Sequence, residues 1–154
     1  MTDFLIIGPF GSVCCYNIFH CIKDDEIFIG YNRVGEFIGD LSANAVWYSS
    51  FYVDDREFLV LKEYREGDYK EYDHFKAINC DRTADIPDYD GIIGVPVTFL
   101  EKYNRKQFKI VDARDYRKDD KFKDMDVQML SGSGGMLAAI DGRPMYSRIL
   151  IRKK

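Results

Sequence analysis

The sequence has 154 residues, of which 46% are hydrophobic, 31% are charged and 15% are aromatic. This length predicts a single domain over residues 1–154, with a core large enough to need no metal or disulfide. Because no apolar stretch approaches the ~20 residues of a membrane helix, and because no basic region precedes the first apolar run, we expect a cytoplasmic protein with no membrane partner.

The charge divides unequally along the chain. Residues 1–103 hold 9 Lys or Arg against 19 Asp or Glu, whereas residues 104–154 hold 13 against 7. The net charge therefore changes from −10 to +6, although the total of −4 argues mildly against a general nucleic-acid binder. A basic C-terminal side indicates an anionic partner. A solvated surface of mixed charge is the equally weighted alternative.

The first part of the chain predicts a strand, a helix and a second strand. Residues 4–7 form a continuous apolar run that ends at a Gly-Pro pair, which predicts a buried strand. Ser12 can cap a helix that ends near Lys23, and residues 27–31 form the next strand. This order over about 30 residues is typical of a crossover unit, so we expect the two strands to be parallel.

Aromatic and β-branched residues predict a hairpin next. Residues 45–53 form its first strand, and residues 58–61 return as the partner across a polar turn. The charged stretch from residue 62 to residue 73 is interpreted as an exposed loop.

The remaining elements are short, apart from a C-terminal hairpin. Strands are predicted over residues 76–80, 92–95 and 108–111. Pro96 suits the first turn of a helix over residues 97–103, and residues 114–124 form a charged loop. Residues 136–154 predict a hairpin around Asp141-Gly142, with alternate residues from Met145 to Arg152 on opposite faces. The fold class is therefore α/β with α+β character: a partial sheet with one crossover helix, β-hairpins and few helices.

The four cysteines are Cys14, Cys15, Cys21 and Cys80. Their spacing lacks the paired CxxC pattern of a structural zinc site, so we predict no metal. We interpret them as buried thiols, and His20 as a histidine on a helix surface.

No motif in the sequence predicts catalysis or a cofactor. The glycine-rich residues 131–135 are followed by no Walker lysine, and no acidic residue lies ~20 positions on to hold a ribose. A flexible turn is the favoured interpretation. Neither His20 nor His74 belongs to a Ser or Cys nucleophile signature.

Basic residues are the better candidates for function, because Lys and Arg neutralise phosphates and interspersed aromatic rings can stack on bases. The predicted nucleic-acid-binding residues are Arg105, Lys106, Arg114, Arg117, Arg143, Arg148 and Arg152.

Three segments, residues 4–31, 89–104 and 146–153, resemble in this order the C-terminal half of the EcoRI-type adenine-specific DNA methyltransferases. The central segment, from Tyr89 to Asn104, matches the family pattern throughout. The resemblance covers nearly the whole chain but about half of a family member. It implies a methyltransferase-like sheet, DNA as a partner and a bacterial or phage restriction-modification system.

The same resemblance identifies motifs that this sequence lacks. Family members carry, before this region, a glycine-rich loop for S-adenosylmethionine and an Asn-Pro-Pro-Phe motif that holds the adenine amino group. The four prolines here, Pro9, Pro87, Pro96 and Pro144, are never adjacent. Pro9 also stands where the family usually has Asn.

Three hypotheses follow from these features. In the first, the chain is the target-recognition portion of a split or truncated adenine methyltransferase, not catalytic alone, and S-adenosylmethionine is bound only with a partner. In the second, it is a non-catalytic module that binds DNA or protein. In the third, the resemblance reports the fold only. Because residues 4–7 would be sticky without covering neighbours, we expect a complementary subunit or self-association.

Overall fold

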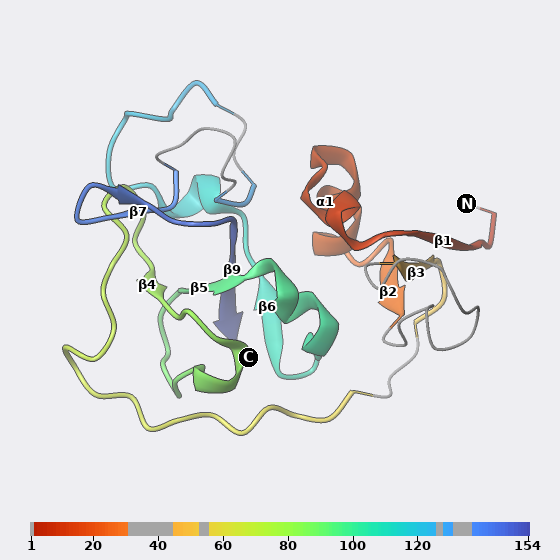
Figure 1. The fold of residues 1–154 in the computed structure, drawn as a ribbon, viewed down its shortest axis with the longest axis horizontal. Coiled ribbons are helices and arrows are strands. Elements are labelled where there is room, and N and C mark those ends of the chain that lie inside the picture. Colours follow the sequence, from red (N-terminus) through yellow and green to blue (C-terminus); the bar gives the residue numbers. More distant parts are fainter. Residues whose placement is uncertain (1, 31–44, 53–55, 126–127, 131–136) are drawn as a thin grey trace. The chain divides into compact units, whose positions relative to one another are not determined.

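The computed structural model describes residues 2–30, 45–52, 56–125, 128–130 and 137–154 (Figure 1). The chain forms two compact units: a first unit of Met1–Arg56 with Leu100–Lys102, and a second unit of Glu57–Phe99 with Tyr103–Lys154. The sequence predicts one domain over residues 1–154, and the structure arranges that length as these two units. None of the described helices is long and apolar enough to cross a membrane.

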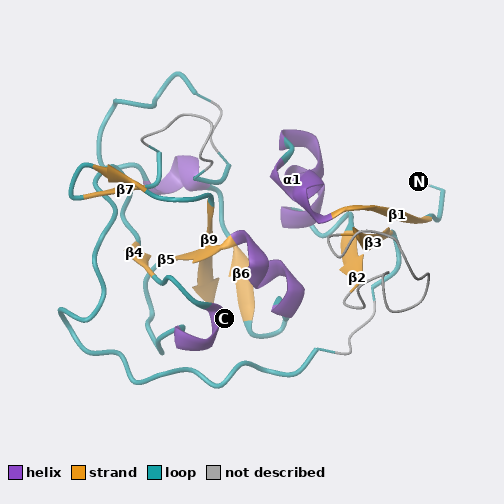
Figure 2. Ribbon diagram, in the orientation of Figure 1, coloured by secondary structure: helices purple, strands orange, loops and turns teal. Residues whose placement is uncertain are grey.

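Sheets and a few short helices make up both units (Figure 2), which confirms the α/β class. The first unit holds a three-stranded sheet of β1 (Leu5–Pro9), β2 (Phe28–Gly30) and β3 (Ala45–Ser49) in the order β1-β3-β2. Because β3 is antiparallel to both neighbours, β1 and β2 run in the same direction, as predicted. They are not adjacent, since β3 lies between them.

The helix of the first unit, α1 (Tyr16–Lys23), ends where the sequence predicts but begins later. Its N-cap is Cys15, whose backbone is extended and whose side chain makes no capping bond. Ser12 lies in a separate 3-10 helix, and its carbonyl oxygen accepts a hydrogen bond from the Cys15 backbone N–H. The prediction that Ser12 caps the helix is therefore wrong.

Strand β1 is exposed rather than buried, which corrects a second prediction. Leu5, Ile6 and Ile7 are 58%, 56% and 41% exposed. β1 pairs only with β3 and forms an edge of the described sheet, so a single neighbour covers it. The buried side chains of this unit come from other elements and include Val13, Phe19, Ile22, Ile29, Val46 and Tyr48.

The second unit is built on a four-stranded sheet in the order β4-β5-β9-β6. Its strands are β4 (Ile78–Asn79), β5 (Ile93–Pro96), β6 (Phe108–Ile110) and β9 (Arg148–Lys153). β4 and β5 are parallel, whereas β9 is antiparallel to both of its neighbours. The predicted strands at residues 76–80, 92–95 and 108–111 are confirmed, and the predicted helix at 97–103 is a 3-10 helix, Val97–Lys102.

The C-terminal hairpin is confirmed only at its turn. β7 (Ala139–Ile140) and β8 (Arg143–Pro144) pair around Asp141 and Gly142, whose φ angles of 51° and 73° are the positive values that this tight turn needs. The chain then leaves β8, and β9 enters the main sheet between β5 and β6. Arg148, Ile149, Leu150 and Ile151 are all buried, so both faces of β9 are covered at these positions.

The hairpin predicted between residues 45–53 and 58–61 is also wrong, because residues 58–61 form no strand. Residues 53–55 lie outside the described part. The Leu59 backbone instead bonds to the Gln107 side chain, donating to Oε1 and accepting from Nε2 at 2.7 Å each. The Gln107 side-chain amide thus satisfies the Leu59 backbone donor and acceptor, as a neighbouring strand would.

The cysteines differ from the prediction at three positions, because Cys14 and Cys15 are exposed and Cys21 is only half-buried. Cys80 is buried and His20 lies exposed on α1, as predicted. The break between the 3-10 helix and α1 falls at Cys14 and Cys15, so neither residue belongs to the apolar stripe. In the described part of the chain no three His, Cys, Asp or Glu side chains form a group that could hold a metal. The glycine-rich residues 131–135 lie outside the described residues.

Candidate nucleic-acid interface

A polar network in the second unit runs from buried Arg148 of β9 and buried Tyr72 to half-buried Asn79 at the end of β4 and exposed Asp81. The Arg148 side chain, only 5% exposed, donates from Nε to Asn79 Oδ1 at 3.2 Å and from Nη2 to Asp81 Oδ1 at 3.2 Å. The Tyr72 hydroxyl donates to the same Asn79 oxygen at 2.7 Å, and Asn79 Nδ2 donates to Asp81 Oδ1 at 2.8 Å. Because its oxygen accepts two hydrogen bonds, the Asn79 amide has one orientation.

Tyr72 is fully buried, and its hydroxyl group holds the Asn79 side chain of this network in place. Burial raises the pKa of its phenol above the ordinary value of 10.0, although the nearby Arg148 guanidinium opposes that shift. A Cβ on Gly94 would lie 2.3 Å from the Tyr72 hydroxyl oxygen, so the strand can pass the ring only with glycine there. The hydroxyl therefore stays neutral and donates at neutral pH.

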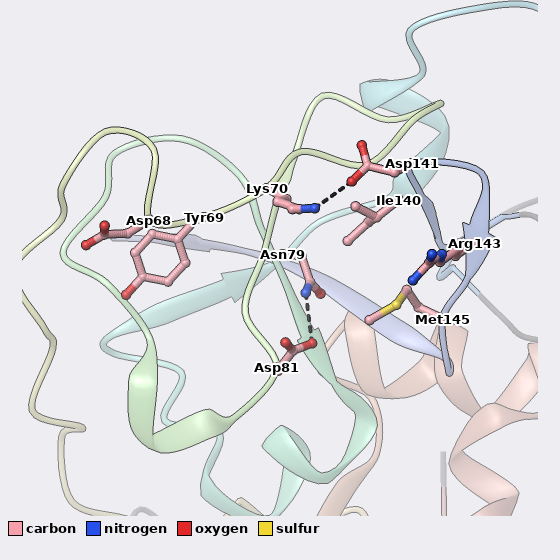
Figure 3. Close-up of a pocket in the computed structure, with 9 residues that line it drawn as sticks. All are labelled: Asp68, Tyr69, Lys70, Asn79, Asp81, Ile140, Asp141, Arg143 and Met145. Atoms are coloured by element: carbon pink, nitrogen blue, oxygen red, sulfur yellow. Dashed lines mark hydrogen bonds and ion pairs between the residues drawn. The ribbon is translucent and has the colours of Figure 1, made fainter.

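The network borders a cavity of about 480 Å³ (Figure 3). Its lining residues are Asp68, Tyr69, Lys70, Asn79, Asp81, Ile140, Asp141, Arg143 and Met145. They come from the loop before β4, from the end of β4 and from the β7–β8 hairpin with the residue that follows it. Asn79 and Asp81 are joined by a hydrogen bond. In Figure 3 this pair lies between Tyr69 on one side and Met145 on the other.

The hairpin wall of the cavity is held in place by acidic side chains. The Asp73 carboxylate accepts the backbone N–H groups of Asp141 and Gly142 at 2.9 and 2.8 Å. Lys70 Nζ lies 2.5 Å from Asp141 Oδ2, and this cation lowers the pKa of the Asp141 carboxyl group. These contacts hold the predicted turn in one position beside the cavity. Arg143 follows the turn and also lines the cavity.

The predicted basic residues do not converge on one patch. Arg143 lines the cavity, whereas Arg148 is buried outside its lining and its guanidinium bonds to Asn79 and Asp81. Arg148 therefore has a structural role, and its contact with nucleic acid stays a prediction. Arg152 is exposed and pairs in register with exposed Lys109 of β6. Lys109 was missed, although its place between buried Phe108 and Ile110 marks it as outward-facing.

The other four predicted residues lie around turns. Arg114 bonds to the Asp112 carboxylate through Nε at 3.0 Å and Nη2 at 2.6 Å. Arg117 donates to the carbonyl oxygens of Lys123 and Met125, which holds the charged loop. Arg105 lies 5.0 Å from the centre of the Tyr103 ring, and the adjacent Lys106 is exposed.

Sequence reasoning also missed the polar residues of the cavity. Asn79 and Asp81 follow the strand predicted at residues 76–80, and a polar pair at the end of a buried strand is the signal that could have found them. Lys70 lies in a stretch interpreted as an exposed charged loop, so nothing local distinguishes it from its neighbours. Their proximity depends on the long-range pairing of β4, β5 and β9.

Comparison with known proteins identifies relatives along the whole chain. Type II methyltransferase M.EcoRI of Escherichia coli is 30% identical over 98% of this chain and 50% of its own length. Type II methyltransferase M.MpnI of Mycoplasma pneumoniae is 25% identical over 99% of this chain and 57% of its own length. Type II methyltransferase M.MgeORF184P of Mycoplasma genitalium is 36% identical over 58% of this chain and 28% of its own length.

The chain thus spans about half the length of the Escherichia coli relative. No solved structure matches it. Residues 35–154, which include both strands of the Lys109–Arg152 pair and all residues that line the cavity, match the family described as adenine-specific methyltransferase EcoRI. This chain therefore belongs to the EcoRI family of adenine-specific methyltransferases.

Proposed function

We propose that this chain supplies DNA recognition for an adenine-specific DNA methyltransferase of a restriction-modification system and does not transfer the methyl group alone. Family membership supports DNA as the partner. The sequence holds no adjacent prolines, and therefore no Asn-Pro-Pro-Phe motif, which supports a cofactor and target-base site supplied by residues outside it. Methylation of an adenine requires the base to leave the duplex, and phosphate contacts would hold the duplex meanwhile.

The observation that carries this proposal is the cross-strand pair of Lys109 and Arg152. The two residues lie directly opposite on β6 and β9, and both are exposed. Like charges opposite each other destabilise an antiparallel pair. Neither side chain forms an ion pair with any residue that the structure describes. A phosphate group would relieve their repulsion and accept hydrogen bonds from both.

A salt titration with duplex DNA tests this assignment. The variant Lys109→Glu/Arg152→Glu should lower duplex affinity about tenfold or more and reduce the slope of log K against log salt by roughly 2, one per cation. The measurement is fluorescence anisotropy of a labelled duplex at several salt concentrations. Arg65→Glu/Lys102→Glu is the matched control, because it makes the same charge change at two exposed cations. Unchanged affinity in the first variant would contradict the proposed interface.

Calorimetry with S-adenosylmethionine tests the second half of the proposal. The isolated chain should release no binding heat with the cofactor, because the cofactor and Asn-Pro-Pro-Phe motifs are absent from it. Clear micromolar binding would overturn the proposal, since a cofactor site would then exist within these residues.

A role in binding protein is the second candidate, and strand β1 favours it. Its three consecutive aliphatic side chains are exposed on an edge of the described sheet. We infer a complementary methyltransferase subunit or a second copy of the chain as the partner, because such edges pair with other strands. Light scattering at tens of micromolar should give a mass above that of one chain, and a monomer would count against this candidate.

The free cysteines suit a reducing cytoplasmic location.

A further inference from the structure

The cavity offers one hydrogen-bond donor and one acceptor side by side. Asn79 Nδ2 carries two N–H bonds, of which one is donated to Asp81 Oδ1. Asp81 Oδ1 accepts from both Asn79 and Arg148, whereas no described residue donates to Asp81 Oδ2. Both residues line the cavity. The network therefore leaves an N–H and a carboxylate oxygen on neighbouring groups for a ligand.

The rest of the lining suits a flat, charged ligand. Tyr69 contributes an aromatic ring, and Met145 with Ile140 contributes apolar atoms on the hairpin side (Figure 3). Lys70 and Arg143 add two cations, of which Lys70 is paired with Asp141. A planar ring can lie between such apolar walls while an attached phosphate meets Arg143. A nucleotide has both parts, a planar base and an attached phosphate group.

We propose that this cavity binds the amidine edge of a nucleobase in a 5′-nucleotide, with adenine as the fitting purine. An amidine edge places an amino donor beside a ring nitrogen acceptor. The amino group would donate to Asp81 Oδ2 while the ring nitrogen accepts from Asn79 Nδ2. Adenine presents this pattern on two edges, N6–N1 and N6–N7, and cytosine on one. Hypoxanthine and thymine place a carbonyl oxygen where the amino group must lie, and guanine presents the pattern only at its N2–N3 edge, next to the sugar.

This inference rests on the proposed function and deepens it, because it assigns a base-reading site to a chain proposed to recognise DNA. The site is separate from the Lys109–Arg152 pair, whose contacts carry no base information. A base extruded from DNA and a free nucleotide present the same edge, so the chemistry is common to both sources.

The test compares two nucleotides that differ in the group at the purine 6-position, an amino group in one and a carbonyl oxygen in the other. An NMR titration of the ¹⁵N-labelled chain should give about fivefold or tighter binding of deoxyadenosine monophosphate than of deoxyinosine monophosphate, with a shift of the Asn79 side-chain amide. Asp81→Asn retains an oxygen for Asn79 and Arg148 but places an N–H where the second carboxylate oxygen was. Two donors match the two acceptors on the O6–N7 edge of hypoxanthine, so this variant should reverse the preference.

Asp124→Asn is the matched control, since it makes the same change at an exposed carboxylate that does not line the cavity. It should retain the preference for the adenine nucleotide. Folding of each variant is read from the same spectra. Equal binding of the two nucleotides, no binding of either, or an unchanged preference in Asp81→Asn would overturn the inference.

A second set of ligands separates the two sources. A duplex with one unpaired adenine that shifts the same amide more strongly than the mononucleotide would assign the site to a base presented by DNA. The reverse order would assign it to a free nucleotide, and either result supports the amidine site. If no ligand reaches Asn79 while duplex affinity still depends on Lys109 and Arg152, the cavity assignment fails and the proposed function survives.

Discussion

Two aliphatic strands of this chain differ in their exposure to solvent. Leu5-Ile6-Ile7 in β1 and Ile149-Leu150-Ile151 in β9 are each three consecutive aliphatic residues. The first run is 41–58% exposed, whereas the second is fully buried. The difference lies in their neighbours, because β9 has a strand on each side and β1 has one. Composition thus predicts a strand, while the contacts that the folded chain makes around it decide whether its side chains are covered.

Buried β9 and exposed β1 should also contribute differently to the stability of the fold and to association with a partner. A side chain with no exposed area loses contacts in every direction when it is shortened, so β9 holds the second unit together. An exposed side chain at a sheet edge contributes little to the fold and leaves an apolar surface for a partner. Ile149 and Ile6 should therefore respond differently to similar changes.

Shortening a β9 side chain should have the largest effect. Ile149→Ala should lower the free energy of unfolding by about 2–5 kcal/mol, because it opens a cavity between the neighbours of a fully buried residue. Ile6→Ala should cost well under ~1 kcal/mol, since that side chain is already in contact with water. Urea unfolding followed by circular dichroism measures both. Equal losses at the two positions would show that β1 is covered in solution.

The second contrast lies within β9, between Arg148 and Arg152. Arg148→Met should cost about 1–3 kcal/mol of unfolding free energy, because Asn79 and Asp81 lose a charged donor inside the fold. The cost is moderate because the Asp81 side chain is 68% exposed and can be solvated instead. Arg152→Met should change stability by less than ~0.5 kcal/mol but weaken DNA binding. A stability loss at Arg152 would refute its assignment as an interface residue.

Local pattern was sufficient for most strands of the second unit. Residues 92–95 are apolar and residues 108–111 alternate around Lys109, and both segments form strands as predicted. The positive φ angles at Asp141-Gly142 also follow from the residue types alone. These features depend on a few consecutive residues, so the sequence predicts them.

Pairing was the part that local pattern could not supply. Residues 148–153 follow a tight turn, which predicts a hairpin arm, yet they insert between β5 and β6, because closing the sheet buries more apolar area than a two-stranded hairpin. The burial of Arg148 follows from that insertion. It also depends on Asn79 and Asp81, which lie about 70 positions away in sequence and make that burial tolerable. The cavity was unpredictable for the same reason.

Alkaline pH should sharpen the contrast between the network and the exposed surface. The folded-state pKa of Tyr72 is raised by burial, so its stabilising effect is complete below pH 10.0 and is lost as pH rises toward that raised pKa. Unfolding free energy should therefore fall above about pH 10. Tyr72→Phe should cost about 1 kcal/mol at pH 7 through the lost bond to Asn79. Its stability should then fall less steeply at alkaline pH, as measured by urea unfolding between pH 7 and pH 11.

The smallest effect on stability is expected at β1, where the change in association should be large. Ile6→Lys places a charge at the centre of an exposed edge strand, so the unfolding free energy should change by less than ~0.5 kcal/mol. An inserted lysine blocks pairing between edges. Light scattering should then show the mass of the wild-type assembly falling to that of one chain. Thr2→Lys, which adds the same charge before the strand at an exposed residue, is the control and should leave the mass unchanged. If both variants stay associated, the apolar edge is not the contact, and the difference between β1 and β9 reflects the fold alone.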